Sequence, residues 1–146
     1  MPREDLFSQL GEPRLRAVVD DFYTRVLADH MIGFMFEDVV RRMGRQHLID
    51  REFELIANLL GAEGIPYTGR PMRQAHARHA IFVGFFDRRL QILRETLRDN
   101  AVPEDIQKVW LDHTESLREQ IIRSKPDPFA PAPAPAGLTK LGRRTR

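Results

Sequence analysis

Apolar residues recur at three- and four-residue steps along most of the chain, which is the spacing of one buried face of an α-helix. The first such stripe follows Pro13, a residue type that favours the first turn of a helix. Its members are Leu15, Val18, Val19, Phe22, Tyr23, Val26 and Leu27. A second helix is predicted at about residues 42–61, closed by Gly61. Its apolar positions are Leu48, Ile49, Phe53, Ile56, Leu59 and Leu60.

Two further stripes predict two more helices in the second half of the chain. The third helix carries Phe82, Phe86, Leu90, Leu93 and Leu97. The fourth begins at Pro103, has acidic residues in its first turn, and carries Ile106, Trp110, His113, Leu117 and Ile121. No stretch alternates as a strand does, and no repeat of 20 to 50 residues occurs. The pattern therefore predicts an all-α protein of four main helices with short extra turns.

The segments that join these helices are unusual. Residues 31–36 form an apolar cluster, Met-Ile-Gly-Phe-Met-Phe, that is too short for a good helix. Residues 61–76 contain three glycines and two prolines, which keep this segment out of long helical structure until just before His76. A loop of this length inside a small helical bundle is often functional.

Composition and charge divide the chain near residue 124. The tail, residues 125–146, holds five of the ten prolines in a Pro-Ala pattern, which cannot donate helical hydrogen bonds and is expected to be disordered. Five basic residues and one acidic residue give this tail a charge of +4, so residues 1–124 carry −2 of the formal total of +2. The basic character therefore belongs to the tail, and no nucleic-acid partner is expected.

Length and residue types exclude several classes of protein. A chain of 146 residues is expected to form one domain, residues 1–124, with a single core. The absence of cysteine excludes disulfides, cysteine zinc sites, iron–sulfur clusters and a thiol nucleophile. No apolar run is long enough to span a membrane, and the first residues lack the apolar stretch of a secretory signal. We expect a cytoplasmic protein.

Five histidines are the only good nitrogen ligands for a metal. Paired Glu-x-x-His motifs, His-Glu-x-x-His, phosphate-binding glycine loops and a serine-hydrolase elbow are all absent. A metal site with one histidine ligand is attractive only if a cofactor brings the other ligands, as haem does. His76, at the end of the glycine- and proline-containing loop, is a candidate ligand, and Tyr23, on the first apolar stripe, is a candidate distal hydrogen-bond donor.

Four segments in register resemble the truncated haemoglobins. They are Asp-Asp-Phe-Tyr-Thr-Arg-Val-Leu-Ala-Asp at 20–29, the phenylalanine cluster at 34–36, Pro-Tyr-Thr-Gly-Arg-Pro-Met-Arg-Gln-Ala-His at 66–76, and Val-Pro-Glu-Asp-Ile at 102–106. The resemblance covers about residues 7–122. It implies a two-over-two helical sandwich, a b-type haem, and binding of oxygen, carbon monoxide or nitric oxide.

The same resemblance assigns roles to individual residues. His76 matches the proximal iron ligand, with His79 as the alternative, and Tyr23 matches the distal tyrosine that hydrogen-bonds the bound gas. Tyr23 could instead donate to a backbone carbonyl. The other residues expected at the haem are Phe22, Phe36, Met72, Ile81 and Phe86. Arg70, Arg73 and Arg78 are weaker candidates for pairing with the propionates.

The register of the distal helix is open, because this chain is longer than the compact group-one pattern between Phe36 and Gly61. The iron-facing pair is either Leu48 and Glu52 or Ile49 and Phe53. We favour Ile49 and Phe53, which continue to Ile56 and Leu60 in steps of three and four residues. A glutamate over the iron would also lose its hydration at a large cost in free energy.

The predicted function is therefore that of a haem protein that binds diatomic gases. Oxidation of nitric oxide is a plausible reaction and requires an external reductase, because no flavin or nicotinamide motif is present. A weak peroxidase activity is a second option, although no distal histidine–arginine pair is apparent. The alternative is a haem-free helical interaction module whose proline-rich tail docks a partner.

Overall fold

The computed structural model describes residues 5–69 and 83–119, and the described chain is helical without any strand. The long helices are α2 (Glu12–Ala28), α4 (Arg45–Leu59), α6 (Val83–Asp99) and α7 (Glu104–Ser116). The short elements are α1 (Leu6–Leu10), the 3₁₀ helix η1 (Gly33–Phe36) and α3 (Glu37–Met43). The predicted all-α class and its four main helices are confirmed. No described helix is long and apolar enough to cross a membrane.

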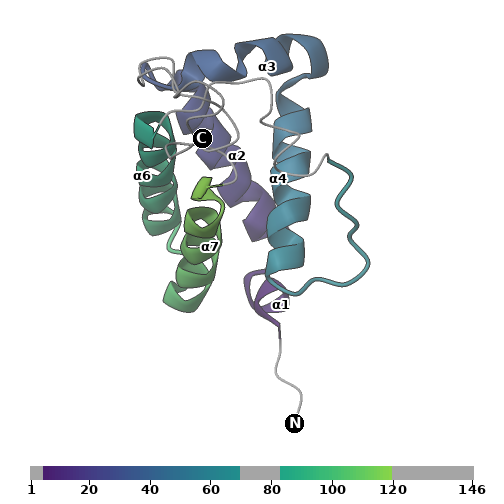
Figure 1. The fold of residues 1–146 in the computed structure, drawn as a ribbon. Helices are drawn as coiled ribbons and strands as arrows, with labels where there is room; N and C mark the ends of the chain where they lie inside the picture. The colour runs from purple at the N-terminus through teal and green to yellow at the C-terminus, as the bar shows by residue number, and fades with distance from the viewer. Residues whose placement is uncertain (1–4, 70–82, 120–146) are drawn as a thin grey trace, which may run out of the picture.

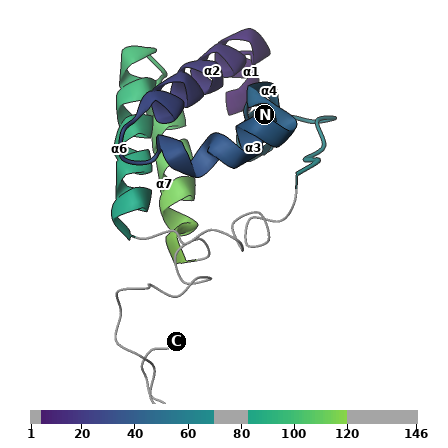
Figure 2. The same cartoon turned by 90° about the horizontal axis from the view of Figure 1, so that it is seen from above.

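The long helices form two packed pairs (Figures 1 and 2). Helix α2 packs against α4, and α6 packs against α7. Contacts between α2 and α6 join the two pairs into one sandwich, while α3 and η1 cross one end of it. This arrangement confirms the expected two-over-two sandwich.

One continuous core fills the sandwich, and the predicted stripes supply most of it. Trp110, Phe22, Leu15, Leu93, Leu97 and Ile106 are among its fully buried side chains. In α7 the buried face includes Thr114, whereas His113 is partly exposed, so that helix is turned slightly from the predicted stripe. The spacing of apolar residues therefore gave the helix faces to within about one residue.

The predicted helix at 42–61 begins later in the structure than in the sequence pattern. Residues 42 and 43 close α3, and Gly44, with φ of +92°, separates α3 from α4. Only glycine adopts this backbone conformation without strain. A break of this kind leaves the apolar spacing intact, which explains why periodicity alone did not reveal it.

The turn between α2 and η1 is fixed to α6 by one carboxylate. Asp29 accepts backbone hydrogen bonds from Met31 and Ile32 at 3.0 and 3.1 Å through Oδ2. Its Oδ1 accepts two hydrogen bonds from Arg88 of α6, at 2.7 and 2.9 Å. Next in the turn, Gly33 lies so close to α2 that a Cβ there would be 2.7 Å from the Leu27 carbonyl oxygen. This close fit brings the aromatic residues of η1 against α2.

Candidate functional site

Six residues expected at the cofactor lie in the described part of the chain: Phe22, Tyr23, Phe36, Ile49, Phe53 and Phe86. The expected iron ligand His76 lies outside the described residues, together with Met72, Ile81 and the alternative ligand His79. The proline-rich tail also lies outside them. What the structure describes is therefore the side of the expected pocket on which Tyr23 lies.

Tyr23 of α2 lies inside the sandwich, with 6% of its surface exposed. Its ring meets Phe22 at a centroid distance of 5.1 Å and an interplanar angle of 68°, and Phe36 at 6.1 Å and 76°. Such edge-to-face pairs restrain a ring in one orientation. Burial is the main cause that raises the pKa of the Tyr23 hydroxyl well above its ordinary value. The hydroxyl is therefore a neutral hydrogen-bond donor at physiological pH.

Two charged side chains from other helices meet this tyrosine. Glu52 of α4 is 9% exposed, and its Oε1 lies 3.5 Å from Nη2 of Arg89 in α6. The Arg89 guanidinium carbon also lies 4.8 Å from the centre of the Phe22 ring. The Glu52 carboxylate raises the pKa of Tyr23 further, whereas the charge of Arg89 acts in the opposite direction. Three helices therefore bring a phenol, a carboxylate and a guanidinium together.

Which of the two alternative registers of α4 faces the iron stays a prediction, but the contacts of the side chains can be described. Ile49 and Phe53 are both buried, at 2% exposure. The Phe53 ring, however, meets Phe7 of α1 at 6.4 Å, and the Arg16 guanidinium lies 3.9 Å from its centre. Glu52 is the α4 side chain that interacts with Tyr23 and Arg89. Helix α4 thus buries two faces: Phe53 contacts α1 and the start of α2, and Glu52 pairs with Arg89 of α6.

Arg89 was missed by the sequence prediction, although the sequence contains a signal for it. Position 89 lies three residues after Phe86 and four before Leu93, so it falls on the buried side of α6. The desolvation argument against Glu52 assumed a carboxylate without a partner. Arg89 supplies that partner from another helix, which reduces the cost of burying the carboxylate.

Phe86 lies on α6 and is buried, at 3% exposure. The guanidinium of Arg118 covers its ring at 4.7 Å. The neighbouring Phe85 meets Phe34 of η1 edge-on at 5.9 Å, and Phe34 itself is 57% exposed. Aromatic side chains of η1 therefore contact both Tyr23 of α2 and the first turn of α6.

The beginning of the loop that leads toward His76 is attached to α4. The Glu54 carboxylate accepts hydrogen bonds from the Thr68 backbone N–H at 2.7 Å and from its hydroxyl at 2.9 Å. Asn58 donates to the Ile65 carbonyl oxygen at 2.6 Å. Arg51 pairs with Glu54 at 2.9 Å and so holds the carboxylate in place. These contacts fix the path of residues 65–68 along the helix that carries Glu52.

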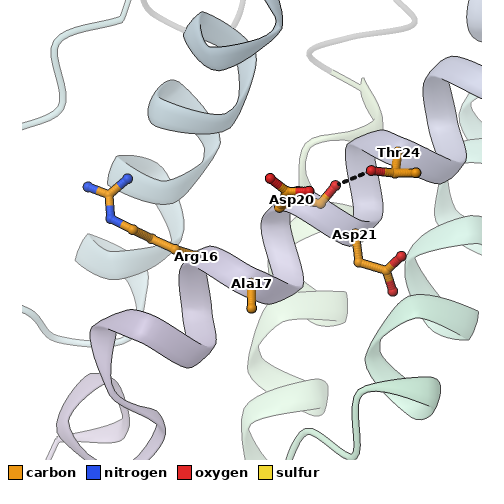
Figure 3. A pocket seen from close by; sticks show the side chains of 5 residues that line it. All are labelled: Arg16, Ala17, Asp20, Asp21 and Thr24. Atoms are coloured by element: carbon orange, nitrogen blue, oxygen red, sulfur yellow. Dashed lines mark hydrogen bonds between the residues drawn. The ribbon is translucent and has the colours of Figure 1, made fainter.

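A shallow surface depression on α2 is a separate feature (Figure 3). It is lined by Arg16, Ala17, Asp20, Asp21 and Thr24, all from one helix. Its carboxylates already have partners: Asp20 pairs with Arg45 at 3.0 Å, and Asp21 pairs with Arg25 at 3.1 Å. Salt bridges between solvated side chains of this kind contribute little to stability. The depression has no donor set for a cofactor and is not the candidate site.

Sequence comparison places this fold among known proteins. The family model described as bacterial-like globin matches residues 5–123. The group 1 truncated haemoglobin GlbN of Mycolicibacterium paratuberculosis is 35% identical over 95 residues, which cover 65% of this chain and 66%, just under two thirds, of that protein. The protein of the same name from Synechocystis sp. is 35% identical over 106 residues, which cover 69% of this chain and 82% of that one.

Solved structures agree with these relatives. A ferric variant of the truncated haemoglobin from Tetrahymena pyriformis has a TM-score of 0.70 at 24% identity, covering 82% of this chain and 98% of that one. The 2/2 haemoglobin from Synechococcus sp., in its cyanomet state with covalently attached haem, has a TM-score of 0.66 at 24% identity, covering 82% and 99%. These two likenesses concern the fold. With the family match over most of its length, the chain belongs to the bacterial-like globin family and is a relative of the truncated haemoglobins.

Proposed function

We propose that this chain binds haem b through His76 and that Tyr23 hydrogen-bonds a gas ligand, oxygen, nitric oxide or carbon monoxide, on the other face. Membership of the globin family supports haem-based gas binding in general. The observation that carries the proposal for this chain is the Tyr23 hydroxyl, a buried neutral donor held by two aromatic rings.

The described residues fit the ligand side of a haem pocket. Phe36, which is partly exposed, and Phe34, whose side chain is largely exposed, provide apolar surface, and the fully buried Phe22 packs on Tyr23. Tyr23 provides a buried hydrogen-bond donor. A phenol in this position suits a ligand that carries partial negative charge, because its hydrogen bond is stronger where the dielectric constant is low.

Bound haem supplies a metal coordination position for the gas, and the chain determines how tightly the gas is held. The raised pKa keeps the Tyr23 proton on its oxygen, where it can be donated to the ligand. The rings of Phe22 and Phe36 hold the phenol in place, so little entropy is lost when it donates. A hydrogen bond to a charged acceptor contributes about 1.5–3 kcal/mol. With this bond the ligand is expected to dissociate at least tenfold more slowly than without it.

Haem uptake tests the first half of the proposal. The wild-type protein, purified and titrated with haemin, is expected to give a Soret band that shifts when carbon monoxide is added after reduction. His76→Ala should lose stable haem uptake, whereas His79→Ala, the matched control in the same segment, should retain it. A wild-type protein that takes up no haemin would refute the proposal and favour a haem-free interaction module. Loss of uptake in His79→Ala alone would move the ligand to that residue.

Oxygen dissociation tests the second half. Tyr23→Phe keeps the ring and its contacts with Phe22 and Phe36 but removes the donor. We expect oxygen to dissociate about tenfold faster or more, as measured by stopped-flow replacement with carbon monoxide. An unchanged rate would assign Tyr23 to packing only.

The proposal extends to oxidation of nitric oxide. Nitric oxide and oxygen combine with one electron to give nitrate, and ferrous haem held by His76 would supply that electron. A separate reductase must then return the iron to the ferrous state before each new cycle. The reaction is tested by mixing the oxygenated protein with one equivalent of nitric oxide, where stoichiometric nitrate and ferric protein are expected. Nitric oxide consumption no faster than in a haemin control would refute this extension.

A further inference from the structure

The buried ion pair between Glu52 and Arg89 is not explained by packing. The buried polar side chains of the described chain are Glu52, Thr96 and Thr114. Thr96 needs no partner from another helix, because its hydroxyl donates to the Ile92 carbonyl oxygen of its own helix at 2.7 Å. Glu52 does need one. Because an apolar pair of similar size is often as stabilising as a buried ion pair, stability alone gives little reason for these charges.

The guanidinium of Arg89 is placed where it can act on a ligand. It lies against the ring of Phe22, which packs edge-on against the Tyr23 ring at a centroid distance of 5.1 Å. The Nη2 atom of Arg89 and the Oε1 atom of Glu52 are 3.5 Å apart, which is long for an ion pair, so within the described chain the carboxylate holds the guanidinium loosely. The Arg89 side chain also keeps 23% of its surface exposed, compared with 10% for Glu52. The Arg89 side chain is thus the more accessible member of the pair.

We propose that Arg89, restrained by Glu52, makes the ligand side of this globin selective for small monovalent anions on ferric haem, relative to neutral carbon monoxide on ferrous haem. This inference rests on the proposed haem binding and adds the class of ligand that the site prefers. A guanidinium remains charged at all physiological pH values and presents several N–H donors. An anion gains a charge-assisted hydrogen bond from it, whereas carbon monoxide carries no net charge and gains little.

Glu52 has a double effect in this arrangement. Its carboxylate restrains the guanidinium, and its negative charge also repels an incoming anion. Glu52→Gln removes the charge and keeps a side-chain oxygen that can accept from Arg89. Anion affinity is therefore expected to change in opposite directions when the two residues are substituted.

The test compares azide and fluoride binding to the ferric protein with carbon monoxide binding to the ferrous protein, each followed by Soret titration. Arg89→Met should weaken both anions by about tenfold or more and change carbon monoxide affinity by less than about threefold. Glu52→Gln should strengthen both anions. Arg88→Met is the matched control, since Arg88 is the preceding residue of α6 and pairs with Asp29. It should leave the ratio of anion to carbon monoxide affinity unchanged.

A vibrational measurement gives an independent readout. A positive charge near the oxygen of bound carbon monoxide lowers the C–O stretching frequency, so Arg89→Met should raise this frequency and Arg88→Met should not. Arg89→Lys, which keeps the charge, should retain most of the anion preference and serves if the methionine variant does not fold.

Three results would overturn the assignment: unchanged anion affinity in Arg89→Met, an equal loss of carbon monoxide affinity, or weaker anion binding in Glu52→Gln. Haem uptake and carbon monoxide binding by the wild type are read first, so a failure of the proposed function is visible there and is not confused with a failure at Arg89.

Discussion

Two neighbouring arginines of α6 form ion pairs in different regions of the molecule. Arg88 meets Asp29 at the turn after α2, with two hydrogen bonds of 2.7 and 2.9 Å. The Asp29 carboxylate also accepts two backbone hydrogen bonds, so both of its oxygens are used. Arg89 meets Glu52 between α2, α4 and α6 through one contact of 3.5 Å. The guanidinium there also lies 4.8 Å from the centre of the Phe22 ring.

The difference shows that similar pairs can have different roles. At the turn, short contacts with every acceptor occupied fix the chain in one conformation, which is a structural role. In the interior, the contact with Glu52 is longer, so among the described residues it restrains the guanidinium less tightly. We therefore expect substitutions at the turn to change stability without changing ligand preference, and substitutions in the interior to change both.

The largest loss of stability is expected for Glu52→Leu. This change leaves the Arg89 guanidinium in the interior without its carboxylate, which should lower the free energy of unfolding by about 3 kcal/mol, as measured by urea denaturation. Adding Arg89→Met should recover most of the loss, because an apolar pair then replaces the ion pair. If the double variant is as unstable as Glu52→Leu, the two side chains are not energetically coupled.

A somewhat smaller loss is expected for Asp29→Ala. The variant loses the hydrogen bonds to Arg88 and to the turn, at a cost of about 2 kcal/mol in unfolding free energy. The ratio of azide to carbon monoxide affinity should stay at the wild-type value. Asp112→Ala is the control, since it breaks only the exposed pair with Lys108 and should leave the unfolding free energy nearly unchanged. A changed ligand ratio in Asp29→Ala would remove the distinction between the two regions.

The smallest expected effect concerns how the contribution of Asp29 to the free energy of unfolding depends on pH. Hydrogen bonds from Arg88 are the main cause that lowers the pKa of this carboxyl. A carboxyl whose pKa is lowered in the folded state stabilises the protein at pH values above its unfolded-state pKa of about 3.9. This stabilisation is lost as the pH falls through the folded-state pKa. The stability difference between wild type and Asp29→Asn should therefore be constant near pH 6 and shrink below about pH 4. Other carboxylates titrate in both proteins, so a difference that grows in acid would contradict this account.

Part of the fold and of the site could be predicted from the sequence. Helix periodicity placed Phe22 and Tyr23 on the inner face of α2, where they lie in the structure. It did not show that Glu52, next to Phe53 in the chain, pairs with Arg89. A helix turns 100° per residue, so adjacent positions face different neighbours when two faces are buried. Which neighbours they meet depends on where α1, α2 and α6 pack.

The sequence by itself determined the helices, the inner stripe that carries Tyr23 and the similarity to truncated haemoglobins. These features follow from residues close together in the chain, whose spacing fixes which side chains share a helix face. Only the tertiary structure decided that Arg89 pairs with Glu52 and that both meet Tyr23. Each of these residues comes from a different helix, and the partner of a buried charge is set by how helices pack rather than by any local pattern.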